Sequence, residues 1–243
     1  MIRFVTAVLC VLFLAAGAKP QLNPEYGSPE YQAPSIFTPD RAVGRPIRDD
    51  VVVVFHGFRS AVPNGTYKRV RKLLKKSHTT IGVNYNYFDI EGTKVLLEKL
   101  AAEELAGRNV TVFGTSLGGF WADWFGRHIG ADQIVMINPV PKPSEEMAKH
   151  VGITEESTRR AISLTTTAEQ VAGYTALEDG GHADIPTLLI LTRDDDALDY
   201  RLAEQRFAGR PGLQLVMFDE GGHTLNLKKH PARDVIQDFV QGN

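Results

Sequence analysis

Short runs of β-branched and aromatic residues alternate along this chain with longer segments of helical periodicity. The pattern predicts strands over 51–55, 81–87, 110–113, 134–137, 187–191 and 213–218, and helices over 67–76, 92–106, 117–128, 201–207 and 231–240. Several of the strand candidates are apolar at nearly every position, which is typical of strands buried on both faces of a parallel sheet. We therefore predict an α/β fold with a doubly wound, mostly parallel sheet.

The first 18 residues have the pattern of a cleavable export signal. Arg3 precedes an apolar run over 4–16 that is too short for a typical membrane span, and residues 16–18 are small, as signal peptidase requires. We expect cleavage before Lys19 and a periplasmic or secreted mature protein without a stable membrane span; an uncleaved anchor is the alternative. The single cysteine, Cys10, lies in this segment, so the mature chain would carry no thiol.

The remaining sequence divides into a leader and one domain. Residues 19–49 are rich in proline and polar residues and lack any period, which predicts an extended or loosely draped leader. The domain proper is expected over 50–243, with a polar stretch over 141–183 that is helical in pieces and could form a partial lid. We see no internal repeats.

The net charge of the chain indicates which classes of partner to expect. The net charge of −2 gives no reason to expect nucleic acid or an anionic membrane as partner. A basic run lies in the predicted helix over 67–76, and its apolar neighbours face one way. We interpret it as a solvated helix face, with an anion-docking patch as the alternative; the run comprises Lys68, Arg69, Arg71, Lys72, Lys75 and Lys76.

The segment 114–119 carries the strongest chemical signal in the chain. It reads Gly-Thr-Ser-Leu-Gly-Gly, which matches G-x-S-x-G, and it lies directly between a buried strand and a helix. Small neighbours are needed there because the serine backbone occupies a strained turn. Ser116 is therefore our candidate nucleophile.

A serine hydroxyl needs an adjacent base, and the chain offers one base and several acids after Ser116. His223 follows the last predicted strand and a Gly-Gly pair, so it is the candidate base. Acidic residues follow the strand over 187–191, which also ends at the sheet edge where open α/β sheets bind ligands. The candidate acids are Asp194, Asp195, Asp196 and Asp199.

These residues resemble the α/β-hydrolase superfamily over the whole span from residue 50 to the C-terminus, and most closely the small YqiA/YcfP-type bacterial esterases. The cues are the segments 56–58, 114–120, 137–139, 195–200 and 220–223. The resemblance implies an α/β-hydrolase fold with a minimal cap that cleaves small-molecule carboxylic esters of small acyl chains without a metal or an organic cofactor. The export signal and the longer stretch over 141–183 depart from that group.

The resemblance also implies the roles of the acid loop. In those enzymes the acid begins a run like the one over 195–200, so Asp195 is the expected acid. Asp194 and Asp196 should then point toward solvent, and Asp199 should cap the helix that begins near Tyr200.

Further residues follow from the same likeness. The amides of Phe58 and Leu117 would hold the oxyanion, and His56 would hold the oxyanion loop as a structural residue. An acyl pocket could be lined by Phe88, Phe120 and Trp121, with packing in the helix core as the equal alternative for the last two.

Rival functions remain open at this level. Thioesters, amides or polyesters could be cleaved by the same triad, because the acyl-enzyme step is shared. A non-catalytic binding module with a vestigial triad is a rival from another class. A dehalogenase is disfavoured, because it needs an aspartate where Ser116 stands.

Overall fold

The computed structural model describes residues 34–87, 89–157, 162–178, 180–181 and 183–242. The predicted signal segment over 1–18, residues 19–33 of the leader and the predicted pocket residue Phe88 lie outside the described residues. Within the described helices, no stretch is long and apolar enough to cross a membrane.

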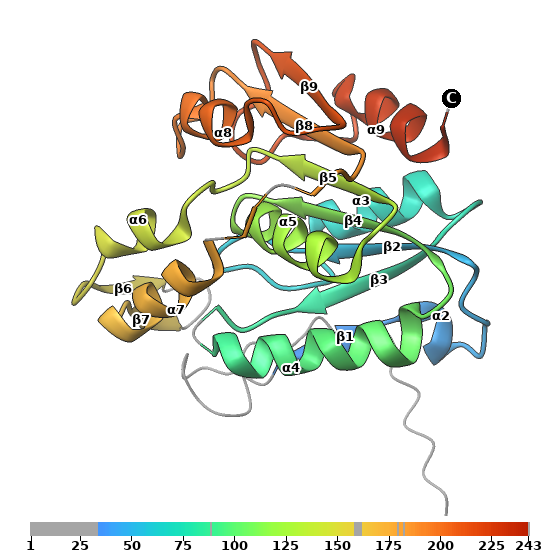
Figure 1. Ribbon diagram of the computed structural model, residues 1–243, viewed down its shortest axis with the longest axis horizontal. Helices are drawn as coiled ribbons and strands as arrows, with labels where there is room; N and C mark the ends of the chain where they lie inside the picture. The colour runs from blue at the N-terminus through green and yellow to red at the C-terminus, as the bar shows by residue number, and fades with distance from the viewer. Residues whose placement is uncertain (1–33, 88, 158–161, 179, 182, 243) are drawn as a thin grey trace, which may run out of the picture.

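A seven-stranded sheet forms the centre of the molecule (Figure 1). Its strand order is β1-β3-β2-β4-β5-β8-β9, and all neighbours are parallel except the β1–β3 pair. The strands are β1 (Ser35–Phe37), β2 (Asp50–Phe55), β3 (Thr79–Asn84), β4 (Asn109–Thr115), β5 (Gln133–Ile137), β8 (Thr187–Thr192) and β9 (Leu213–Phe218). The predicted parallel sheet is thus confirmed.

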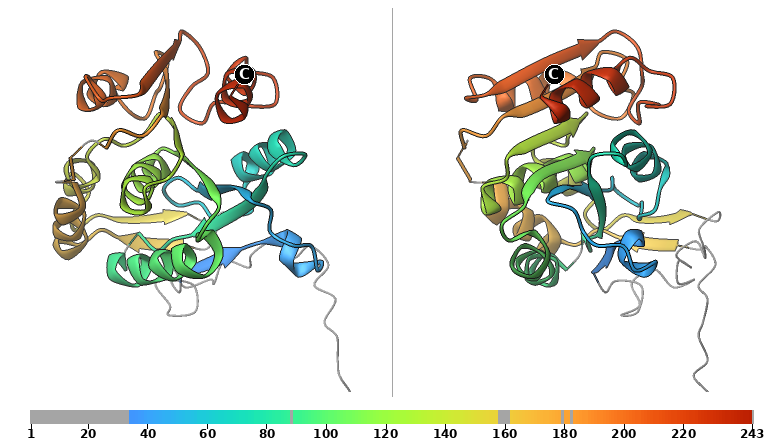
Figure 2. Two further views of the ribbon diagram at one scale, coloured as in Figure 1. Left: turned by 45° about the vertical axis from the view of Figure 1, so that its right-hand side comes forward. Right: turned by 90° about the vertical axis from the view of Figure 1, so that its right-hand side faces the viewer.

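Helices cover both faces of this sheet (Figure 2). On one face α3 (Gly65–Leu74) and α9 (Ala232–Gln241) pack on alternate residues of β2, β5 and β8. The other face is covered by α4 (Ile90–Leu100), α5 (Leu117–Ile129) and α8 (Tyr200–Phe207). A π-helical turn, Ala101–Leu105, extends α4. Because both faces are covered, the central strands β2 and β8 are buried over nearly their whole length, as their apolar runs predict.

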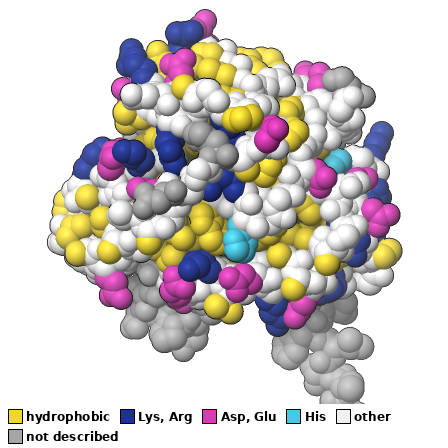
Figure 3. All heavy atoms as spheres, viewed as in Figure 1, with side chains coloured by type: hydrophobic (Ala, Val, Ile, Leu, Met, Phe, Trp, Pro, Cys, Tyr) yellow, Lys and Arg dark blue, Asp and Glu magenta, His cyan; other side chains and the backbone are white. Residues whose placement is uncertain are grey.

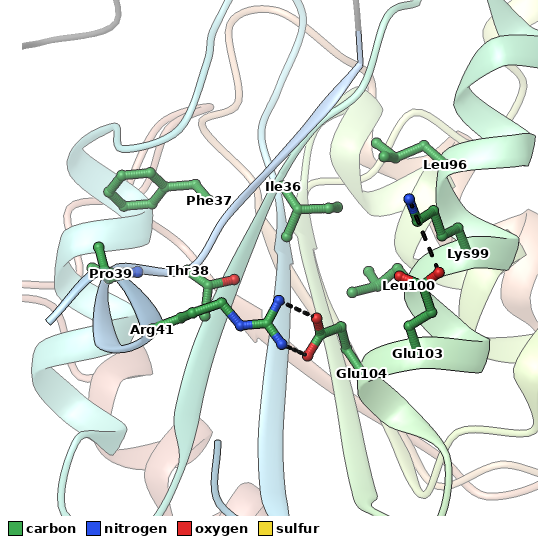
Figure 4. Close-up of a pocket in the computed structure, with 11 residues that line it drawn as sticks. Ile36, Phe37, Thr38, Pro39, Arg41, Leu96, Lys99, Leu100, Glu103 and Glu104 are labelled. Atoms are coloured by element: carbon green, nitrogen blue, oxygen red, sulfur yellow. Dashed lines mark hydrogen bonds and ion pairs between the residues drawn. The ribbon is translucent and has the colours of Figure 1, made fainter. Parts of the chain in front are cut away.

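The sheet begins before the predicted domain boundary at residue 50. β1 pairs antiparallel with β3, and the short helix α2 (Pro39–Ala42) follows it, so this part of the predicted leader is structured. The prediction failed here because a three-residue edge strand is too short to show a period. Arg41 of α2 forms an ion pair with Glu104, which ties this segment to the π-helical turn after α4 (Figure 4). Both residues line a cavity of about 590 Å³.

The polar stretch over 141–183 contains two helices and a hairpin. Between α6 (Pro143–Ala148) and α7 (Ala168–Glu178) lie the antiparallel strands β6 (Thr154–Ser157) and β7 (Ile162–Thr165). The hairpin was not predicted. The carboxylate of Glu178 accepts hydrogen bonds from the amide and the hydroxyl of Ser144, each 2.7 Å long, so α7 is joined to the start of α6.

Apolar side chains reach the surface over the part of the molecule that carries α8 and β9 (Figures 1 and 3). Leu202 of α8 and Leu215 of β9 are among the exposed large hydrophobic residues. β9 is the last strand in the sheet order, so its outer edge has no strand partner among the described residues.

Candidate active site

Ser116 lies at a sharp turn between β4 and α5. Its backbone has φ 56° and ψ −130°, a left-handed conformation that is strained for a residue with a side chain. The turn is held on both sides, since the Ser116 amide donates to the Ile137 carbonyl at 3.0 Å and the Ser116 carbonyl accepts from the Val140 amide at 3.1 Å. A Cβ on Gly114 would overlap the backbone of Gly118, so the glycines allow this close turn.

The structure brings together His223 and Asp195, the residues that the sequence predicts as base and acid. Nδ1 of His223 lies 2.9 and 3.0 Å from the two carboxylate oxygens of Asp195, whose side chain is only 1% exposed. Burial opposes ionisation of this carboxyl group, but the hydrogen bonds from His223 and from the amides of Leu198 and Ala197 outweigh it, so the pKa of Asp195 is lowered. An ionised acid can orient the imidazole and stabilise its cation.

Ser116 and His223 open into the same cavity, which has a volume of about 410 Å³. Its walls come from the loop after β2, the turn between β4 and α5, the segment from Val140 through α6 to His150, Thr166, and the loops after β8 and β9. The lining residues are Phe58, Arg59, Ser116, Leu117, Val140, Pro143, Glu146, Met147, His150, Thr166, Ala197, Leu198 and His223. The predicted lid segment thus supplies one wall of the cavity.

Phe58 and Leu117 line this cavity from two elements. A Cβ built on Gly57 would lie 3.3 Å from Cβ of Ser116, which shows how closely the loop after β2 approaches the serine. Among the described residues, neither the Phe58 amide nor the Leu117 amide donates a hydrogen bond to another protein group. Leu117 is also the first residue of α5, where the helix dipole favours negative charge.

His56 holds the loop that carries Phe58 rather than entering the cavity. Its side chain is buried, Nδ1 lies 2.8 Å from the Gly57 carbonyl, and its ring stacks on Tyr85 with the ring centroids 4.4 Å apart. The Tyr85 hydroxyl in turn donates to the His56 carbonyl at 2.7 Å. Burial lowers the pKa of His56 to about 4, so the ring is neutral near pH 7.

Phe120 and Trp121 do not line the cavity, although both were weighed as pocket residues. Trp121 is fully buried among Tyr85, Tyr174 and Trp124, and Phe120 packs on the same Tyr174. The alternative of helix-core packing therefore holds for both. The sequence could not distinguish pocket lining from core packing, because consecutive residues at the start of a buried helix are apolar in both cases.

Asn138 connects the end of β5 with the end of β8 and with the loop that carries His223, a role that the sequence analysis missed. Its backbone is left-handed, with φ 42°, and its side chain is buried at the end of β5. The side-chain oxygen accepts from the Thr192 amide at 2.9 Å, while Nδ2 lies 3.1 Å from the Thr192 hydroxyl, 3.2 Å from the Gly222 carbonyl and 3.1 Å from the His223 carbonyl. The residue therefore joins the end of β8 to the histidine loop.

Asp194 is exposed, as the sequence predicts, and it also holds the loop that carries His223, which the sequence analysis did not predict. Its carboxylate accepts the amides of Gly222 at 2.8 Å and Gly221 at 3.0 Å, and these hydrogen bonds lower its pKa. Gly222 has φ 61°, a conformation that glycine adopts without strain. Asp199 caps α8 as predicted, accepting from the Arg201 amide at 3.0 Å. Within the described residues, no cluster of histidine, cysteine and acidic side chains could hold a metal ion.

The buried neutral His56 should make the stability of the protein depend on pH. The pKa of the folded state, about 4, lies below the ordinary value of 6.5, so the unfolded chain takes up the proton first as the pH falls. The free energy of unfolding should therefore drop by about 3 kcal/mol through this group between pH 6.5 and pH 4, with no further loss below.

Denaturant unfolding at pH 7 and pH 4.5 measures this loss. His56→Asn keeps a donor near the Nδ1 position and cannot titrate, so its loss over the same range should be smaller. An equal loss in both proteins would contradict the assignment.

Asn138→Asp should lower kcat with little change in KM, and it should also lower the melting temperature, because the new carboxyl group is buried among acceptors. An ionised carboxylate cannot donate to the carbonyls of Gly222 and His223 and would repel them, which displaces the histidine; a misplacement of about 1 Å can cost about 100-fold in rate. Steady-state kinetics on p-nitrophenyl butyrate measures the effect. The matched control is Asn226→Asp, an exposed asparagine whose side-chain oxygen accepts from the Lys228 amide. An unchanged kcat, or an effect on KM alone, would show that Asn138 does not position the histidine.

Solved structures with a similar fold include three from different organisms. Est1E from Butyrivibrio proteoclasticus has a TM-score of 0.64 and 15% identity, covering 86% of this chain and 91% of that chain, and it has also been solved with ferulic acid bound. Alpha/beta hydrolase domain-containing protein 10 from mouse has a TM-score of 0.61 and 11% identity, covering 86% and 92%. The hydrolase olei00960 from Oleispira antarctica has a TM-score of 0.56 and 19% identity, covering 86% and 94%. These likenesses establish the α/β-hydrolase fold.

Sequence comparison gives a closer placement. No curated protein sequence matches the chain. The family model of the uncharacterised protein family UPF0227 matches residues 51–240, which is most of the chain and includes all three residues of the candidate triad. The chain therefore belongs to the UPF0227 family, in agreement with the resemblance to YqiA/YcfP-type enzymes.

Proposed function

We propose that this protein is a serine esterase that hydrolyses carboxylic esters of small acyl chains through an acyl-Ser116 intermediate. One observation carries the proposal: the Asp195–His223 pair, joined at 2.9 Å, opens into the same cavity as a serine on a strained strand-to-helix turn. Esterases and lipolytic enzymes among the structures of the same fold support ester hydrolysis as the reaction class.

The geometry suggests how each group would act. Nδ1 of His223 is occupied by Asp195, so Nε2 takes the proton of the Ser116 hydroxyl as its oxygen attacks the ester carbonyl. The amides of Phe58 and Leu117 would stabilise the resulting oxyanion, each by about 3 kcal/mol. The tetrahedral intermediate then collapses, and Nε2 returns the proton to the departing alcohol.

Deacylation repeats these steps with water. Nε2 removes a proton from the water as it attacks the acyl carbon, and the carboxylic acid leaves as the proton returns to the serine oxygen. Thioesters and amides would pass through the same acyl-enzyme, so the leaving group distinguishes them only in the first half of the reaction.

The cavity favours small acyl groups. Its volume of about 410 Å³ lies near the lower end of the usual range for ligand pockets. Val140, Pro143, Met147 and Leu198 are among its apolar lining residues. This space suits a short acyl chain beside the leaving group.

A fluorophosphonate probe should label Ser116 and no residue of Ser116→Ala. Asp195→Asn should react far more slowly, since losing the acid of a comparable triad costs about 10⁴-fold in kcat. Asp196→Asn is the matched control, an exposed aspartate next to the acid. Labelling is followed by gel fluorescence and peptide mass spectrometry on folded protein. Equal labelling of Ser116→Ala, or loss in Asp196→Asn instead of Asp195→Asn, would refute the triad.

Short p-nitrophenyl esters should be better substrates than long ones. The walls described above leave room for acetyl or butyryl groups, so kcat/KM should fall as the acyl chain lengthens. A preference for chains beyond about twelve carbons would show that the segment over 141–183 builds a longer acyl site. A parallel series of thioester and amide substrates identifies the favoured leaving group.

A further inference from the structure

A second cleft, remote from Ser116, is lined mainly by cationic side chains. It lies between α2 and the C-terminal end of α3, where β3 begins, and has a volume of about 430 Å³. We name it the basic cleft; its lining residues are Asp40, Arg45, Pro46, Arg48, Arg71, Lys75, His78 and Thr79. β3 and β4 run in the same direction as β2. The start of β3 therefore lies at the amino end of the parallel strands, and the end of β4, which precedes Ser116, lies at their carboxyl end. The basic cleft is thus separate from the candidate active site.

The positive charge of the basic cleft is only partly neutralised. Asp40 is its single carboxylate, with Oδ1 3.0 Å from Arg71 and 3.6 Å from Arg45. Arg48 donates to the uncharged carbonyl of Lys76, and among the described residues neither Arg48 nor Lys75 forms an ion pair. The lining therefore carries four cations against one anion.

His78 is the remaining titratable group of the basic cleft, and it adds no charge near pH 7. Burial lowers the pKa of His78, Asp50 raises it and Arg48 lowers it, with a net lowering. The ring is therefore neutral near pH 7.

A buried donor inside the basic cleft lacks an acceptor. Nε of Arg71 is buried from solvent and donates to no group among the described residues, although the same guanidinium is held by Asp40 through Nη2. Because this Nε is closed to solvent, a ligand would reach Arg71 through the exposed part of its side chain, which is 37% exposed. The ion pair of 3.0 Å to Asp40 holds the Arg71 guanidinium group before any ligand arrives.

We propose that the basic cleft binds a phosphate-type oxyanion, either inorganic phosphate or the phosphate group of a larger molecule. The Arg71 guanidinium group held by Asp40, the exposed Arg45 and two cations without an ion pair provide charge-assisted donors from several directions, which suits an anion with several oxygens. The cations come from α3 and from the segment before β2, so they converge on one point rather than following the stripe that a nucleic-acid backbone needs.

Isothermal titration with inorganic phosphate, at constant ionic strength, tests this site. The variant Arg45→Gln with Lys75→Gln removes two exposed lining cations and should weaken the phosphate Kd by about tenfold or more. The matched control, Lys68→Gln with Lys72→Gln, removes the same charge from exposed positions of α3 that do not line the cleft. It should bind phosphate as the unmodified protein does.

A second arm identifies the source of the phosphate group. Co-sedimentation with phosphatidylcholine vesicles that contain phosphatidic acid tests a lipid headgroup against the free ion. Binding of either probe that depends on Arg45 and Lys75 supports the site and names its ligand. No saturable binding of either probe, or equal weakening in both double variants, overturns it. Fluorophosphonate labelling of Ser116 should be the same in both double variants, so this test is independent of the proposed esterase activity.

Discussion

The left-handed backbone of Ser116 is the constraint on which the rest of the site depends. Such a conformation costs about 1–3 kcal/mol, and it persists only where the surroundings hold it. Here β4 and α5 fix it from within the chain, and hydrogen bonds to Ile137 and Val140 fix it from the neighbouring strand. The turn brings the serine to the edge of the sheet and places it at the start of a 13-residue helix whose dipole favours an oxyanion.

The loops around Ser116 are linked through hydrogen bonds to backbone groups. Asn138 is bound to the end of β8 and to the histidine loop, and Asp194 holds the same loop through two glycine amides. His56 and Tyr85 hold the loop that carries Phe58, since the Tyr85 hydroxyl donates to the His56 carbonyl and the two rings stack. Because these contacts bind backbone groups, they can fix the positions of Ser116, Asp195 and His223 without entering the cavity.

The sequence predicted the order of the central strands and helices well, because buried parallel strands are apolar along their whole length. It failed at β1 and at the β6–β7 hairpin, where three or four residues are too few to show a period. That Ser116 and His223 line one cavity was predictable, because each sits in a local motif after a strong strand. The contacts of Asn138 were not, since they join residues more than 50 positions apart, and Trp121 was ambiguous because pocket and core residues look alike in sequence.

The central claim is that turnover passes through a covalent acyl-serine. Rapid acid quench of the enzyme during hydrolysis of p-nitrophenyl butyrate, followed by peptide mass spectrometry, tests it most directly. The account predicts one butyryl group on the peptide that contains Ser116, appearing and disappearing at rates consistent with turnover. A butyryl group on another residue, or continued turnover with no adduct on Ser116 even when deacylation is slowed, would contradict it.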